Sequence, residues 1–149
     1  MKSRNILIIA GFTAITINTI MLKVSNLIGI KAESGGLLKL ILLWLPRPIS
    51  GLDLFKTQFF RYLFHFATGA AMVFVYHLTL EKSTIRVFWK GVVFSCFPWL
   101  VNGLIVLPLL HQGVLGIGQL SVSGIIYFFF ANLAFGLSLV YVMKILKHP

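Results

Sequence analysis

Four apolar runs without a charged residue constrain this chain more than any other feature of its sequence. None of them contains Asp, Glu, Lys or Arg, and they cover residues 6–22, 62–80, 92–110 and 120–143. A helix needs about 20 mostly apolar residues to cross the hydrocarbon layer of a membrane. Three of the runs exceed the length at which a buried helix of a soluble protein is the better explanation. The sequence therefore predicts four membrane-spanning helices.

The composition agrees with lipid as the solvent. Hydrophobic residues make up 58% and charged residues 11% of the 149 residues. A typical soluble domain has about 45–50% apolar and about 25% charged residues. A chain of this length supplies a single domain. We predict an all-α fold over residues 1–149, an integral membrane four-helix bundle.

The first run has a secretory signal peptide as its rival interpretation, because it is slightly short for a span. A signal peptide ends at a cleavage site of small residues. Here the run ends in Met21-Leu22-Lys23-Val24. We expect a retained first span.

Residues 23–61 separate the first two spans and are richer in charge. They contain a short segment, about residues 36–46, in which the nine-residue run Leu37 to Leu45 is followed by Pro46-Arg47-Pro48. Nine helical residues at about 1.5 Å each reach only about half the hydrocarbon thickness. Trp44 and Arg47 favour the level of the lipid headgroups. We predict a short interfacial or re-entrant helix here, with a fifth span as the less favoured alternative.

Cations in short connections predict the side of the membrane on which each connection lies. Each terminal tail has two cations, the connection 81–91 has three, and the connection 111–119 has none. This alternation predicts that both termini are cytoplasmic. The six cations of residues 23–61 would then lie outside, where long connections follow the rule less strictly.

The net charge of +10 suits anionic lipids better than nucleic acid. A nucleic-acid-binding domain gathers its Lys and Arg on one face. Here the 13 cations are spread over tails and connections between apolar runs. Basic flanks are attracted to anionic leaflets. We expect membrane lipids as partners and no nucleic acid.

Polar side chains inside the spans indicate the interior of the bundle, because they are costly in hydrocarbon. A rise of about 1.5 Å per residue places Asn102 and Asn132 near the middle of their spans, and Asn18 and His65 about 6–9 Å from it on one side. One hypothesis is a polar cavity lined by these four residues and open toward residues 111–119. The other is interhelical hydrogen bonding at about 0.6–2 kcal/mol per bond, the commoner role of such residues.

Pro98 predicts a kink in the third span. It lacks the N–H that would bond to the carbonyl of Phe94. With Trp99 and Asn102 it forms the most site-like feature of the sequence, although ordinary helix bending accounts for such a proline as well.

Small residues four positions apart occur in every span and mark faces that another helix can approach closely. Examples are Ala10-x-x-x-Ala14, Gly91-x-x-x-Ser95 and Ala134-x-x-x-Ser138. Packing within the chain uses such faces. A homo-oligomer or a larger membrane complex would use them equally well.

No cofactor site, metal site or catalytic set can be assembled from the sequence. His65 and His77 share one span and lie about 18 Å apart, whereas a bis-His haem needs ligands at matched depth on different helices. Cys96 is the single cysteine and cannot form a disulfide within the chain. The three acidic residues lie outside the spans. We expect no cofactor and no enzymatic activity.

The second half of the chain carries a loose set of motifs. They are His65-x-x-x-Gly69, Trp89-Lys90-Gly91, Trp99-x-x-Asn102-Gly103, Leu107-Pro108-Leu109 and Gly113-x-x-Gly116. This pattern, mainly over residues 62–143, resembles uncharacterised small four-span proteins of the bacterial inner membrane, loosely the YagU-like family. That family often has His-x-x-x-Gly in its fourth span, where this chain has Asn132-x-x-x-Gly136. The resemblance implies a bacterial inner-membrane location and no particular activity.

Two hypotheses of function come from these features. The first is a non-enzymatic accessory or structural component of the membrane that acts through helix–helix contacts. The second is a transporter of a small solute or lipid that uses the layer of Asn18, His65, Asn102 and Asn132.

Overall fold

The computed structural model describes residues 3–32 and 36–147, and its long elements are all helices. Within these ranges no β-strand forms, and one isolated bridge joins Ile117 to Leu120. Lys2 and Glu33 lie outside the described residues. In chain order the elements are α1 Ser3–Leu27, α2 Gly36–Trp44, α3 Arg47–Ser50, the 3-10 helix η1 Asp53–Lys56, α4 Gln58–Thr79, α5 Val87–Val101, the π-helix η2 Asn102–Val106, α6 Leu107–Leu109, the 3-10 helix η3 Val114–Gly116 and α7 Val122–Lys147.

Four helical stretches are long and apolar enough to cross a membrane, which confirms the predicted four-span fold. They are Arg4–Leu27, Gln58–Thr79, Val87–Leu109 and Val122–Lys147. Their ends differ from the predicted limits, which were placed at charged residues. α1 continues past Lys23 to Leu27, and α7 continues past Lys144 to Lys147. The long stem of a lysine lets its charge reach water while the backbone stays helical.

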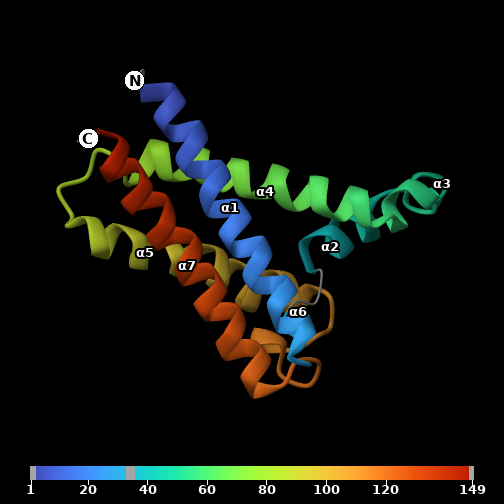
Figure 1. Ribbon diagram of the computed structural model, residues 1–149. Helices are drawn as coiled ribbons and strands as arrows, with labels where there is room; N and C mark the ends of the chain where they lie inside the picture. Colours follow the sequence, from blue (N-terminus) through green and yellow to red (C-terminus); the bar gives the residue numbers. More distant parts are fainter. Residues whose placement is uncertain (1–2, 33–35, 148–149) are drawn as a thin grey trace.

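Helix α7 lies between α1 and α5 and packs along both of them (Figure 1). Close approach of α5 and α7 depends on small residues. A Cβ placed on Gly136 would lie 2.1 Å from the Ser95 hydroxyl oxygen and 2.5 Å from the carbonyl oxygen of Gly91. Ala10 and Ala14 of α1 are likewise fully buried. The predicted small-residue faces of the first and third spans are therefore used within the chain, and Gly136 forms the close contact of α7.

Helix α4 touches the rest of the bundle mainly through its C-terminal half. Gly69 faces Ile15 of α1, and Val73 faces Gly11, so that the two helices meet at small residues. Farther from the termini α4 diverges toward α2 and α3 (Figure 1). Much of its surface is exposed, including Ala67, Ala70 and Ala71.

The main hydrophobic core lies where all four long helices are together. It consists of Ile6, Ala10, Ala14, Ile15, Val73, Tyr76, Phe94, Phe135, Leu139, Val140 and Met143. We call residues 4–15, 69–79, 87–95 and 135–147 the packed half. Residues 16–32, 36–44, 53–68, 96–109 and 120–134 form the cavity half, whose core is a small cluster of Leu22, Ala32 and Ala131.

The segment between the first two spans contains the predicted short helix. α2 occupies Gly36–Trp44, and a second short helix, α3, follows at Arg47–Ser50. Gly36 lies against the third span, because a Cβ there would meet Val106, Asn102 and Leu107 at 3.0–3.2 Å. α2 therefore packs at its first residue onto the end of that span.

The irregularity of the third span lies beyond Pro98. α-Helical geometry continues through the proline to Val101, and a π-helical turn follows at Asn102–Val106, where the N–H of Leu107 donates to the carbonyl of Asn102. π-Helical turns inside α-helices are frequent at functional sites. The backbone distortion thus begins at the polar residue Asn102.

Candidate binding cavity

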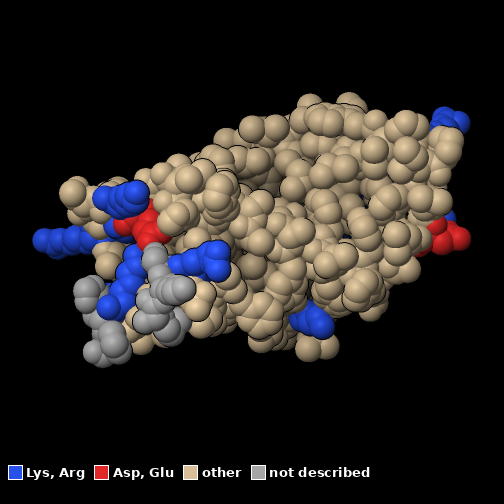
Figure 2. All heavy atoms as spheres, turned by 90° about the horizontal axis from the view of Figure 1, so that it is seen from above, with Lys and Arg blue, Asp and Glu red and all other residues tan. Residues whose placement is uncertain are grey.

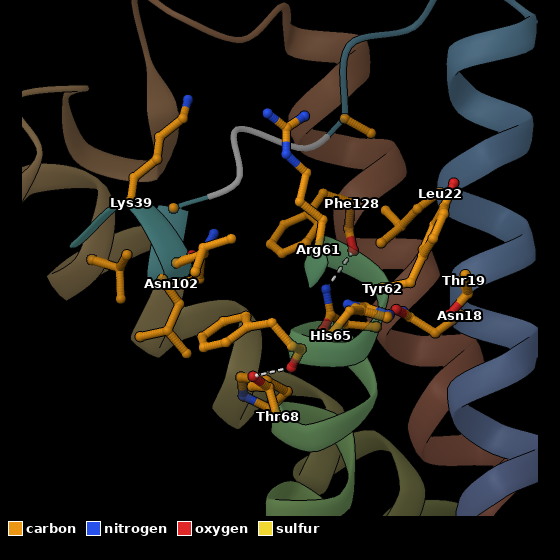
Figure 3. A pocket seen from close by; sticks show the side chains of 18 of the residues that line it. Asn18, Thr19, Leu22, Lys39, Arg61, Tyr62, His65, Thr68, Asn102 and Phe128 are labelled. Carbon is orange, nitrogen blue, oxygen red and sulfur yellow. Dashed lines mark hydrogen bonds between the residues drawn. The ribbon is translucent and has the colours of Figure 1, made fainter. Parts of the chain in front are cut away.

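A cavity of about 860 Å³ lies between α4 and the other helices in the cavity half (Figure 3). All five residues singled out in the sequence line it: Asn18, His65, Pro98, Asn102 and Asn132. Val106 and Leu120, which flank the connection 111–119, also belong to its wall. The cavity exists because the N-terminal half of α4, before its contact at Gly69, diverges from the bundle.

The inner end of the cavity is polar. A smaller crevice of about 100 Å³ shares Asn18, His65, Thr68 and Asn132 with the main cavity. The Asn18 side-chain amide donates to the carbonyl of Ala131 on α7, at 2.9 Å. The Asn132 amide donates to the carbonyl of Phe128 on its own helix, at 2.8 Å. Each of these amides keeps a second N–H and a carbonyl oxygen for further bonds.

The structure contains features of both hypotheses for these residues, the polar cavity and the interhelical hydrogen bond. Asn18 joins α1 to α7 through its hydrogen bond, as a residue that fixes helix register does. Asn102 has no side-chain hydrogen bond within the described ranges, although it lines the cavity. Asn102 and Asn132 are not hydrogen-bonded to each other. The polar layer is an interhelical contact at Asn18 and a cavity wall at Asn102.

The outer part of the cavity carries four cations that sequence reasoning did not assign to a site. They are Lys23, Lys39, Lys56 and Arg61, which come from α1, α2, η1 and α4. The sequence spacing could have indicated one of these cations, Arg61, as a cavity residue. Arg61 and His65 are four residues apart, and such residues lie on one face of a helix.

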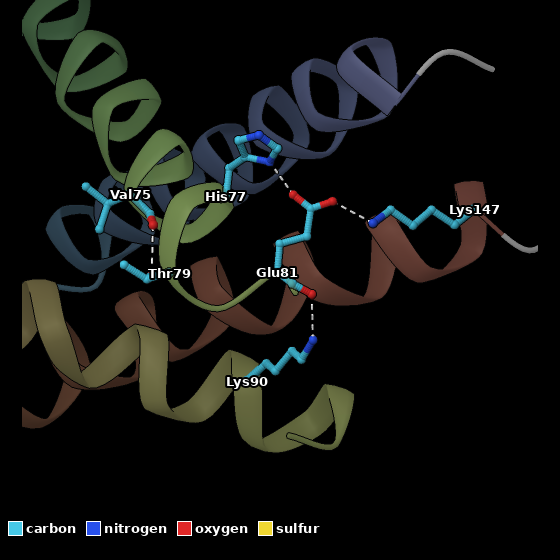
Figure 4. Close-up of polar contacts among 6 residues, drawn as sticks. All are labelled: Val75, His77, Thr79, Glu81, Lys90 and Lys147. Carbon is cyan, nitrogen blue, oxygen red and sulfur yellow. Dashed lines mark hydrogen bonds and ion pairs between the residues drawn. The ribbon is translucent and has the colours of Figure 1, made fainter. Parts of the chain in front are cut away.

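At the opposite end of the molecule, which we call the closed end, Glu81 makes polar contacts with three helices, as Figure 4 shows. Its carboxylate pairs with His77 of α4 and, at 2.6 Å, with Lys147 of α7. Its backbone carbonyl accepts a hydrogen bond from Lys90 of α5 at 2.8 Å. Burial raises the pKa of Glu81, but the hydrogen bonds and charges of Lys147 and His77 outweigh it and hold the pKa below its ordinary value.

The charges at the two ends frame an apolar surface. On the face seen in Figure 2, most Lys, Arg, Asp and Glu side chains gather toward the ends and leave a broad uncharged band between them. Exposed apolar side chains such as Ile8, Phe74 and Val93 belong to the long helices. This distribution suits a chain surrounded by hydrocarbon at its middle. Among the described residues no group of three or more His, Cys, Asp and Glu is placed to hold a metal ion.

The chain matches no protein-family model, no curated protein and no solved structure.

Proposed function

We propose that this protein is a non-enzymatic membrane protein that binds and transports a small solute or a lipid through the cavity. One observation carries the proposal: Asn18, His65, Asn102 and Asn132, from four different spans, line a single cavity of about 860 Å³. Ligand cavities in proteins are typically about 300–1,000 Å³ with a few polar groups among apolar walls. Polar groups at membrane depth face water or a ligand rather than hydrocarbon.

The closed end supports transport over simple storage. A transporter gives its site access to one side of the membrane at a time. Here the cavity half is open, while Glu81 joins α4, α5 and α7 at the other end. We infer that release toward the second side requires these three contacts to open.

We propose a bacterial inner membrane as the location, with both termini in the cytoplasm. The cations of residues 23–61 then lie on the outer side, against the usual bias. Four of the six line the cavity and are explained by its ligand: Lys23, Lys39, Lys56 and Arg61. The packed half, with Lys82, Arg86, Lys90, Lys144 and Lys147 around it, would face the cytoplasm.

Thiol labelling at two adjacent residues tests whether the cavity is wet. Thr68 lines the cavity, and Ala67 is exposed on the outer surface of α4. The two differ in depth by only about 1.5 Å. In a Cys96→Ala background, Thr68→Cys and Ala67→Cys are treated with a membrane-impermeant thiol reagent. A thiol reacts as the thiolate, which needs water.

The proposal expects Thr68→Cys to react at least about tenfold faster than Ala67→Cys, since a thiolate forms readily only in a polar environment. Equal, slow labelling of both variants would mean a dry interior and would remove the basis for a transporter. Labelling of the Val140→Cys variant in the packed half serves as the buried reference.

One specific observation supports the alternative hypothesis of an accessory membrane component. Small residues are buried in helix contacts in the other spans, but Ala67, Ala70 and Ala71 of α4 are exposed. A second helix can approach such a face closely. Native mass spectrometry in a mild detergent tests this alternative, which requires a homo-oligomer or a copurifying partner. A monomer alone would contradict it.

A further inference from the structure

The cations of the cavity are gathered from four elements that lie far apart in the sequence. Lys23 and Arg61 belong to spans, whereas Lys39 and Lys56 belong to the segment between them. Bringing like charges together costs free energy that an anion offsets. The arrangement is therefore that of an anion site formed by the folded chain.

Two of these four cations have no side-chain partner among the described residues. Lys56 pairs with Asp53 at 2.9 Å, and the Lys23 ammonium lies 4.6 Å from the centre of the Tyr62 ring. Lys39 and Arg61, in contrast, form no ion pair or side-chain hydrogen bond within residues 3–32 and 36–147. No acidic residue of those ranges lines the cavity. Lys39 and Arg61 are thus available to an anionic ligand.

A second polar layer lies one helical turn deeper. His65 follows Arg61 by four residues, which is about 6 Å along α4, and Asn18 precedes Lys23 by about 7.5 Å along α1. The unused N–H groups of the Asn18 and Asn132 amides can donate to neutral carbonyl oxygens. A ligand that fits both layers has an anionic group at one level and hydrogen-bond acceptors about 6–8 Å deeper.

The remaining walls are apolar and exceed what a small anion needs. They include Leu37, Leu42, Phe64, Phe97, Val101 and Phe128. Leu43 and Trp44 on the neighbouring surface of α2 are 68% and 72% exposed. Trp prefers the headgroup level of a membrane. The mouth of the cavity is therefore suited to an amphiphile that enters from the membrane.

We propose that the cavity binds an anionic phospholipid whose phosphate lies between Lys39 and Arg61. Its ester carbonyls reach the layer of Asn18, His65 and Asn132, and its acyl chains leave along the apolar wall. This assignment rests on the proposed function and names its substrate class. Arg presents several N–H groups to phosphate oxygens, and Lys contributes a point charge.

Lipid binding to the purified full-length protein, followed by native mass spectrometry, tests the assignment. The probes have identical acyl chains: phosphatidylglycerol is anionic, phosphatidylcholine is zwitterionic, and diacylglycerol has no phosphate. Lys39→Gln with Arg61→Gln removes the proposed phosphate contacts. Lys31→Gln with Arg47→Gln removes the same charge from the same segment at residues that do not line the cavity.

We expect phosphatidylglycerol to bind about tenfold more tightly than phosphatidylcholine, and the Lys39/Arg61 variant to lose about tenfold of that affinity, as for one or two charged hydrogen bonds. The Lys31/Arg47 variant should stay within about twofold, as for exposed charges. Equal losses in both variants would overturn the phosphate assignment. Equal binding of both phospholipids, which share the phosphate, would overturn the preference for an anionic lipid. Thermal unfolding of both variants verifies that each is folded.

Other outcomes distinguish failure of the phospholipid assignment from failure of the proposed transport function, on which the assignment rests. Diacylglycerol binding as tightly as phosphatidylglycerol would overturn the phosphate contact with Lys39 and Arg61 and leave a lipid-binding cavity. If inorganic phosphate displaced phosphatidylglycerol at equal concentration, the ligand would be a free anion, and the assignment of a lipid as the ligand would be overturned. Absence of binding by every probe, together with unlabelled Thr68→Cys, would overturn the proposed function itself.

Discussion

The packed half and the cavity half are built from the same four long helices, yet one is a dense core and the other is hollow. In the packed half, Gly11, Gly69 and Gly136 bring their helices into contact. In the cavity half, Lys23 of α1 reaches the Tyr62 ring of α4 across a cavity that polar residues line. Apolar sequence alone therefore does not decide packing in this chain. Small residues determine where the helices meet, and polar residues lie where they part.

The largest expected effect comes from enlarging Gly136. The Gly136→Leu substitution would force its side chain into Ser95 and the backbone carbonyl of Gly91. A backbone atom cannot move aside as a flexible side chain does, so we expect a loss of about 3 kcal/mol or more. Thermal unfolding in detergent and the yield of monodisperse protein measure it.

The matched substitution for Gly136→Leu is Ala70→Leu, which adds side-chain volume on the exposed surface of α4. It should unfold at nearly the wild-type temperature. If Gly136→Leu were equally stable, close approach of α5 and α7 would not be what holds the packed half together.

A smaller effect is expected at Glu81, whose carboxylate is 11% exposed and pairs with both His77 and Lys147. Glu81→Gln should destabilise the protein by about 1–3 kcal/mol, because charged partners lose their counter-charge in a partly buried site. Asp53→Asn is the comparison at the other end. Its pair with Lys56 is 94% and 69% exposed, and we expect no measurable change in unfolding temperature. Similar losses in both variants would contradict a special role for the closed end.

Acid should weaken the same contact. The pKa of Glu81 is held below its ordinary value in the folded protein. Its contribution to stability is therefore complete above the unfolded pKa of about 4.3 and is lost as the pH falls through the folded pKa. The wild-type unfolding temperature should drop more steeply below about pH 4.5 than that of Glu81→Gln. Parallel curves for the two proteins would show that another group controls the acid response.

Hydropathy was sufficient to predict four spans and a short helix between the first two, since length and charge decide both. Depth counted along each helix placed Asn18, His65, Asn102 and Asn132 in one layer, and the structure brings them to one cavity. Rise per residue says nothing about lateral distance. The divergence of α4 therefore could not be foreseen, because it depends on contacts at one end only.

Contacts outside the spans were also beyond sequence reasoning. Glu81 meets Lys147, 66 positions away, and no local pattern links them. The sequence predicted a kink at Pro98, and the π-turn at Asn102–Val106 was not predicted. Proline frees a carbonyl locally, but the helix remains regular until a polar residue borders the cavity.

The smallest effect distinguishes the two roles of asparagine within the cavity half itself. Asn18→Leu removes the hydrogen bond to Ala131 and should cost about 0.6–2 kcal/mol, as interhelical bonds in membranes do. Asn102→Leu removes no side-chain hydrogen bond within the described ranges, so its unfolding temperature should stay close to that of the wild type. Phosphatidylglycerol binding, measured on the same two proteins, should fall in both. If Asn102→Leu were the less stable of the two and bound lipid normally, Asn102 would be a packing residue of the third span. Asn102 would then line the cavity without contributing to ligand binding.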